Sequence, residues 1–272
     1  MRIFDPHIHM VSRTTDDYER MALAGIQLVL EPAFWLGQPR THVGTFIDYW
    51  SMIIEWERQR AANFGVGHVC TIAVNPKEAN DEALAAEALE AMPEFLDRDG
   101  VVGVGEIGYD DITPQEEKIM VAQIEMALER DLPIMVHTPH RDKGKGTERS
   151  IAVLRDMDVS PDQVIIDHNT EESIGAAKDF GCWCGHTIYP DTKLSQERFA
   201  NILDEYGTER MIANSSADWG PSDPLAVPKT TKVLLRRGYD LDTVQRIVWN
   251  NPVDFFGQSG KLEPLEAPIP DA

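Results

Sequence analysis

Cysteine is scarce in this sequence, with Cys70, Cys182 and Cys184 the three among 272 residues. A small, odd number argues against a disulfide framework and indicates a reducing compartment, so we expect a cytoplasmic protein. Cys182 and Cys184 could chelate a metal. We favour the simpler interpretation that they are two small apolar side chains on one face of a buried strand.

Positive charge and long apolar runs are also lacking. The 25 Lys and Arg residues against 46 Asp and Glu residues give a formal net charge of −21, whereas proteins that bind nucleic acid need a basic surface for the phosphates. No stretch approaches the ~20 apolar residues of a membrane-spanning helix. We therefore expect neither long nucleic acid nor a membrane among the partners, and the sequence carries no indication of oligomeric state.

The chain alternates short apolar runs with longer helical stretches. The runs resemble strands buried on both faces, and they are Arg2–His7, Ile26–Glu31, Gly67–Ala73, Val101–Glu106, Pro133–His137, Val164–Asp167, Cys182–His186 and Arg210–Ala213. The predicted helices include Ile47–Asn63, Pro76–Ala91, Pro114–Arg130 and Leu194–Tyr206. Thr113, Pro114 and Glu116 give the third of these helices an N-cap, a proline at the first position and a carboxylate at the third.

Eight strand-plus-helix units in 272 residues correspond to about 34 residues per unit, the size of one crossover connection. We therefore expect an α/β fold, a single (β/α)8 TIM barrel over residues 1–260, because such barrels usually have ~250 residues. An extended tail is expected over residues 261–272. The same alternation also permits an open, doubly wound parallel sheet.

Residues able to bind metal ions follow many of the predicted strands. In chain order they are His7, His9, Glu106, His137, His168 and Asp218. In a barrel the carboxyl ends of the strands converge on one face, where active sites are built. Each residue alone has an ordinary explanation, such as a helix cap for Glu106 or a core hydrogen bond for His137 and His168. The series as a whole favours a metal centre.

His7 and His9 are two residues apart, so in an extended strand their side chains point to the same side. Two neutral imidazoles on one side can hold the same cation, and their nitrogen atoms suit zinc and its neighbours. A pair of this kind is often incidental when it stands alone. The histidines and acidic residues that follow the later strands support metal binding by this pair.

This ordered series resembles the TatD-like metal-dependent hydrolases of the amidohydrolase superfamily. The resemblance extends to residues 248–256, Val-Trp-Asn-Asn-Pro-Val-Asp-Phe-Phe, which are similar to that family's closing helix and Asn-Pro turn. It implies that His7 and His9 bind a first divalent metal ion and that Glu106 bridges to a second. His137 and His168 would bind that second ion.

The resemblance also implies that Asp218 is a metal ligand and the catalytic carboxylate beside the first ion. There it would orient the nucleophilic water and carry its proton to the leaving group. The family commonly carries Thr-Asp before a proline at the last strand. Residues 214–220 of this chain are Asn-Ser-Ser-Ala-Asp-Trp-Gly, so the chain departs from the family at this point.

The activity expected from this resemblance is hydrolysis by a metal-activated hydroxide at a binuclear site, with Glu106 and Asp218 as catalytic residues. Two cations ~3.5–4 Å apart lower the pKa of a shared water and polarise a substrate oxygen. Zinc suits the histidines best, and manganese or magnesium would also fit. The expected substrate is a phosphoester or a small ester, lactone or amide. The alternatives are an isomerase or lyase, and a non-catalytic metal-binding barrel.

Glu31 ends the second predicted strand with a carboxylate that the resemblance does not explain. It could orient a ligand histidine from behind the metal centre. It could equally form a helix cap or a salt bridge.

Residues 138–147 are expected to form a loop over the active face. Arg141, Lys143 and Lys145 would make this loop a positive patch suited to a phosphate or carboxylate. The alternative is a solvated loop without such a role.

His140, His186 and Trp219 are further candidates for substrate contact, because each lies near the end of a predicted strand. Four aromatic residues could wall a pocket for an organic group or only pack loops against the barrel rim: Phe34, Trp35, Trp183 and Trp219.

Overall fold

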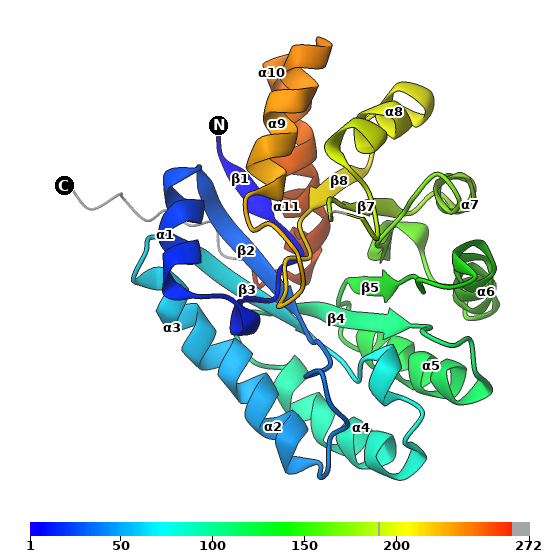
Figure 1. Ribbon diagram of the computed structural model, residues 1–272. Helices are drawn as coiled ribbons and strands as arrows, with labels where there is room; N and C mark the ends of the chain where they lie inside the picture. The colour runs from blue at the N-terminus through cyan, green and yellow to red at the C-terminus, as the bar shows by residue number, and fades with distance from the viewer. Residues whose placement is uncertain (190, 263–272) are drawn as a thin grey trace.

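The structure is a computed structural model that describes residues 1–189 and 191–262. Its strands form one parallel sheet in the order β1 to β8, and Figure 1 shows them around a common centre with the helices outside. The strands are β1 (Ile3–Asp5), β2 (Ile26–Pro32), β3 (Gly67–Ile72), β4 (Val101–Gly108), β5 (Ile134–His137), β6 (Val164–Ile166), β7 (Trp183–Thr187) and β8 (Met211–Asn214). The predicted (β/α)8 barrel and its eight strands are confirmed.

The ring closes between β1 and β8, just beyond the ends of both strands. The Ser216 amide donates to the carbonyl of His7 at 2.7 Å, and the His9 amide donates to the carbonyl of Ala217 at 2.9 Å. Ile8 and Ala217 form a parallel bridge between these two bonds. Residues from opposite ends of the chain therefore lie side by side, which an open sheet does not require.

Helices connect successive strands and cover the outside of the sheet. They are α1 (Thr15–Leu23), α2 (Gly44–Ser51), α3 (Glu57–Ala62), α4 (Glu82–Leu96), α5 (Pro114–Leu128), α6 (Lys143–Asp156), α7 (Ile174–Phe180), α8 (Gln196–Tyr206), α9 (Ala226–Arg237), α10 (Leu241–Gln245) and α11 (Asn251–Phe256). A π-helical turn, Met52–Trp56, joins α2 to α3. The prediction of a loop over residues 138–147 is wrong for its second half, because α6 begins at Lys143. No helix in the described ranges is long and apolar enough to cross a membrane.

Apolar side chains fill the barrel and plug its amino-terminal end. Inward-facing residues from the strands pack with the two phenylalanines of α11, and this inner core contains Phe4, Leu28, Leu30, Val69, Val102, Met135, Ile165, Ile212, Phe255 and Phe256. The rings of Phe4 and Phe256 lie 6.1 Å apart. With this end closed by apolar packing, the polar residues gather at the carboxyl ends of the strands. A second, larger core lies between the sheet and the helices, and all three cysteines are buried and unpaired.

The predicted tail lies largely outside the described residues. Of residues 261–272 the structure describes Lys261 and Leu262. The Lys261 ammonium donates to the carbonyl of Leu96 at 2.7 Å, so this first part of the tail contacts the barrel.

Helix α5 begins at the predicted cap, which gives a direct test of the local fold. Thr113 Oγ1 accepts from the Glu116 amide at 3.1 Å, and the Glu116 carboxylate accepts from the Thr113 amide at 3.1 Å. We predict that Thr113→Ala lowers the free energy of unfolding by about 1–2 kcal/mol, measured by urea denaturation. Thr113→Ser, which keeps the hydroxyl, serves as the control. Equal midpoints for Thr113→Ala and the native protein would contradict the assigned cap.

Candidate metal centre

Five of the six predicted metal ligands converge at the carboxyl ends of β1, β4, β5 and β6. Glu106 Oε1 lies 3.0 Å from His137 Nδ1 and 3.0 Å from His168 Nε2. The same oxygen is 3.8 Å from His7 Nε2, and His7 Nε2 is 3.0 Å from His9 Nε2. All five side chains are buried. The barrel thus gathers into one site residues that are up to 161 positions apart in sequence.

Asp167 fixes which nitrogen of His7 carries a proton. Asp167 Oδ2 lies 2.5 Å from His7 Nδ1. Burial alone would raise the pKa of Asp167, but His168 and His7 hold that pKa well below its usual value, so the carboxylate is ionised and only accepts. His7 Nδ1 is therefore the donor, and Nε2 is the nitrogen that faces the centre.

A hydrogen-bond chain from the same carboxylate reaches His168. Asp167 Oδ1 accepts from Asn214 Nδ2 at 2.8 Å, which turns the amide oxygen of Asn214 towards Thr187. That oxygen accepts the Thr187 hydroxyl proton at 2.7 Å. The Thr187 oxygen, 2.6 Å from His168 Nδ1, is left to accept from that nitrogen. The Lys193 ammonium also lies 3.0 Å from His168 Nδ1, and His168 Nε2 faces Glu106 Oε1 at 3.0 Å.

The nitrogen atoms of His7 and His168 face Glu106 Oε1 in a buried site. Burial lowers the pKa of His9 and His168 well below the usual value. Burial would raise the pKa of Glu106, but His7 and His137 hold it well below its usual value. Facing acceptors in a buried site are costly unless a cation lies between them.

The donor set fits a divalent cation. Ligand atoms of His7, Glu106, Asp167 and His168 all lie within 4.8 Å of one another. Imidazole nitrogen and carboxylate oxygen together suit zinc, and they also accept manganese. The buried nitrogen atoms of His7 and His168 therefore have the chemistry that a metal ion would satisfy.

Asp218 lies outside this set of converging atoms. Its Oδ1 accepts from the Tyr189 hydroxyl at 2.9 Å and from the Gly220 amide at 2.8 Å. Ser216 instead faces the centre, with its hydroxyl 3.4 Å from His7 Nε2. The unusual sequence after β8 thus places a hydroxyl at the centre and a carboxylate beside Tyr189. The catalytic role of Asp218 remains a prediction.

Two residues at the centre were missed in the sequence. Asp167 directly precedes His168, and the Asp-His pair was the available signal. Lys193 has no comparable signal, yet its ammonium lies 3.0 Å from His168 Nδ1 and 3.3 Å from Ser216 Oγ. Burial lowers the pKa of Lys193 to about 8. Within residues 1–189 and 191–262, no carboxylate lies close enough to Lys193 to form an ion pair.

Glu31 belongs to a different buried network. Its carboxylate lies 2.9 Å from His68 Nε2 and accepts from the Val11 amide at 2.9 Å. Neither partner is a predicted metal ligand, and burial raises the pKa of Glu31. The salt-bridge interpretation of Glu31 therefore fits better than contact with a ligand histidine.

The three basic residues after β5 do not form one patch. The Lys143 ammonium donates to Thr138 Oγ1 at 2.7 Å and to the His168 carbonyl at 3.1 Å, so it ties together the segments after β5 and β6. Arg141 is exposed and pairs with Asp111, and Lys145 is exposed on α6.

The two remaining histidine candidates lie in different surroundings. His140 is exposed, with its ring 6.3 Å from that of His137, so it lies near the centre. His186 is fully buried against Phe199 of α8, at a ring distance of 5.0 Å. Because the neighbouring Thr187 faces the centre, the alternation of the strand directs His186 towards the helix layer.

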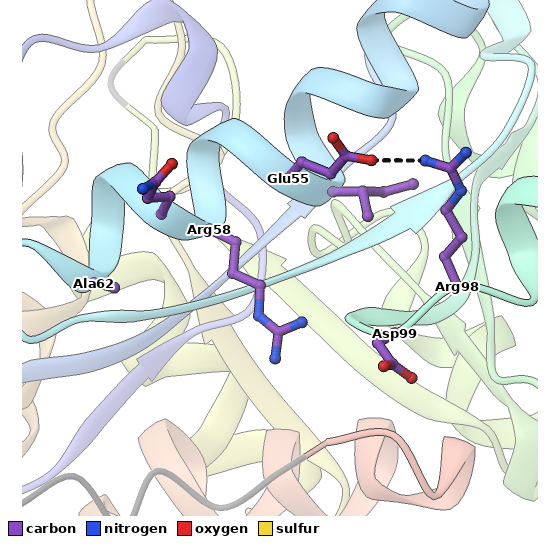
Figure 2. Close-up of a pocket in the computed structure, with 7 residues that line it drawn as sticks. Glu55, Arg58, Ala62, Arg98 and Asp99 are labelled. Carbon is purple, nitrogen blue, oxygen red and sulfur yellow. Dashed lines mark hydrogen bonds and ion pairs between the residues drawn. The ribbon is translucent and has the colours of Figure 1, made fainter.

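A hollow of about 540 Å³ lies on another part of the molecule. Figure 2 shows its lining, including the ion pair between Glu55 and Arg98 at 2.9 Å. Arg98 and Asp99 directly precede β4, so the hollow lies at the amino ends of the strands. It contains none of the predicted site residues.

Comparison with known proteins agrees with this arrangement. The family model described as TatD related DNase matches residues 4–257. The chain belongs to this family. An uncharacterized metal-dependent hydrolase of Methanocaldococcus jannaschii is 28% identical to this TatD-related chain over 259 residues, 93% of the chain and 99% of the relative. The predicted family is thus confirmed.

Solved structures share the fold of this TatD-related chain. A TatD-like protein of Archaeoglobus fulgidus has a TM-score of 0.77 and 24% identity, over 93% of this chain and 99% of that chain. The phosphotriesterase homology protein of Escherichia coli, solved with phosphate in its active site, has a TM-score of 0.70 and 15% identity, over 94% and 98% of the two chains.

Substitution of Asp167 tests whether its hydrogen bonds orient His7 for metal binding. Asparagine at this position would turn an N–H towards either His7 Nδ1 or Asn214 Nδ2, both of which are donors, so one hydrogen bond must be lost. We predict that Asp167→Asn weakens zinc affinity by about 10–100-fold, measured by competition with a chelating dye. The exposed Asp16→Asn serves as the control. Zinc affinity unchanged by Asp167→Asn would contradict the assignment.

Proposed function

We propose that this protein is a metal-dependent hydrolase with two divalent ions at the carboxyl face of the barrel. The observation that carries the proposal is the approach of His7, His137 and His168 to one buried oxygen of Glu106. Membership of the TatD-related family supports it. The printed description of the archaeal relative, a metal-dependent hydrolase, supports it as well.

His7 and His9 would hold one ion, His137 and His168 the other, and Glu106 would lie between the two. Zinc suits this set best, and manganese or magnesium are further candidates. When bound, such ions act as Lewis acids and supply a water nucleophile at neutral pH.

The chain's own residues would orient the substrate and move its proton. The Lys193 ammonium, buried beside Ser216, would donate to an oxygen of the substrate on which negative charge develops. Asp218 would take the proton of the attacking water and pass it to the leaving group. Tyr189, which donates to Asp218, would hold that carboxylate in place.

The substrate we propose is a small phosphoester or a small ester, lactone or amide. The phosphate in the E. coli homologue's active site and the fold shared with a lactonase of Listeria monocytogenes point to these two bond types. The net charge of −21 disfavours long nucleic acid. Three buried, unpaired cysteines support a cytoplasmic location.

The activity is tested by assaying metal-loaded protein against phosphodiesters, phosphomonoesters and carboxylic esters side by side. We expect turnover of at least one class, abolished by chelation and restored by metal. Reaction in oxygen-18 water should label the product, whereas an isomerase or lyase would leave the product unlabelled. No turnover of any class by protein with two bound ions would contradict the proposal.

Asp218 can be tested separately. We predict that Asp218→Asn lowers kcat by about 100-fold or more, because the variant loses the proton carrier, while metal content stays unchanged by elemental analysis. Asp223→Asn, which changes a carboxylate paired with Lys229, is the matched control. Unchanged kcat in Asp218→Asn would show that another group carries the proton.

A further inference from the structure

We propose that three aromatic side chains beside the metal centre form a subsite for a flat ring of the substrate. We call Phe34, Trp35 and Trp219 the aromatic wall. The inference rests on the proposed hydrolase function and narrows its substrate to a small molecule that carries an aromatic or similarly flat conjugated ring.

The aromatic wall is continuous with the metal centre. The Phe34 ring stacks on the His9 ring at a centroid distance of 3.8 Å and an interplanar angle of 17°. Trp219 lies 5.1 Å from Phe34, and Trp35 lies 5.9 Å from Trp219. The rings therefore lead from a predicted metal ligand outward to solvent, and a substrate held at the centre would lie within reach of them.

The aromatic wall is also partly open to solvent. Trp219 is 48% exposed, whereas Trp50 and Tyr18 in the outer core are fully buried. Phe34 and Trp35 are half-buried. Burying this apolar surface under a ring would be favourable, and offset or edge-to-face contacts between rings add to that gain. An exposed cluster next to a polar centre thus has the composition of a ligand site.

The aromatic wall is held in place by two loops from distant parts of the sequence. Phe34 and Trp35 follow β2, and Trp219 follows β8. A Cβ at Gly37 would lie 3.3 Å from the Trp219 ring, and Gly37 has a φ of +77°. The glycine thus allows the indole to lie against the backbone of the other loop. A surface fixed in this way loses little conformational freedom when a ligand binds.

Trp35 also lines a cavity of about 310 Å³. Polar residues line the same cavity, with Lys77 3.7 Å from Asp110 and 4.8 Å above the Trp35 ring. Arg40 and Glu78 also line it. This volume is at the lower end of small-molecule sites, so it fits a single ring system with a polar substituent.

The experiment compares phenylphosphonate with methylphosphonate, two non-hydrolysable anions that differ by the ring. We expect the metal-loaded protein to bind phenylphosphonate about tenfold more tightly by isothermal titration calorimetry, as ring stacking plus burial predicts. In Trp219→Ala the ratio should fall to about threefold or less, with affinity for methylphosphonate unchanged. Trp56→Ala is the matched control, because Trp56 is 60% exposed and lies in the turn between α2 and α3.

Equal affinities for the two probes, failure of both to bind, or a ratio unchanged in Trp219→Ala would each overturn the aromatic subsite. A second assay separates this result from the proposed function. If the native protein binds the two probes equally and hydrolyses alkyl esters, the subsite alone is rejected. Ring preference without hydrolysis of any ester rejects the proposed function and leaves the subsite standing.

Discussion

One buried oxygen atom, Glu106 Oε1, sets the chemistry of this barrel. It lies 3.0 Å from two imidazole nitrogens and 3.8 Å from a third. Hydrogen bonds from behind hold the rings of His7 and His168 so that one nitrogen of each faces it. A protein interior does not tolerate facing acceptors without a positive charge between them. The arrangement of these atoms therefore favours a cation, as do the types of residue present.

The hydrogen bonds that orient the histidines also join the strands at the carboxyl face of the barrel. Asp167 follows β6, Thr187 ends β7 and Asn214 ends β8, so one chain of hydrogen bonds crosses three neighbouring strands. From Asp167 it reaches His7 beyond β1, across the closure of the ring. Gly185 is part of this arrangement, because a Cβ there would meet Asp167 Oδ1 at 2.2 Å. Closing the barrel and orienting the histidines are therefore done by the same residues.

Much of the fold and the ligand set could be predicted from the sequence. The strands are buried and rich in β-branched residues, and the histidines of the candidate centre lie at or just beyond the strand ends. Both features can be recognised in the sequence. What the sequence did not provide was contact between distant segments. Asp167 can orient His7 only because the fold brings His7 and Asn214 next to it. Lys193 reaches the centre from the segment after β7. Glu31 and His186 lie at or near the ends of strands, yet each faces away from the centre. The side of a strand that a residue faces depends on the register of the strand, and the sequence alone does not determine that register.

Metal content is the measurement that tests the central claim most directly. Protein produced without a histidine tag, saturated with zinc and freed of excess metal, can be analysed for zinc per chain by elemental analysis. We expect two zinc ions per chain, because four histidines and Glu106 gather at this centre. A correctly folded chain that retains no zinc after this treatment would contradict this expectation.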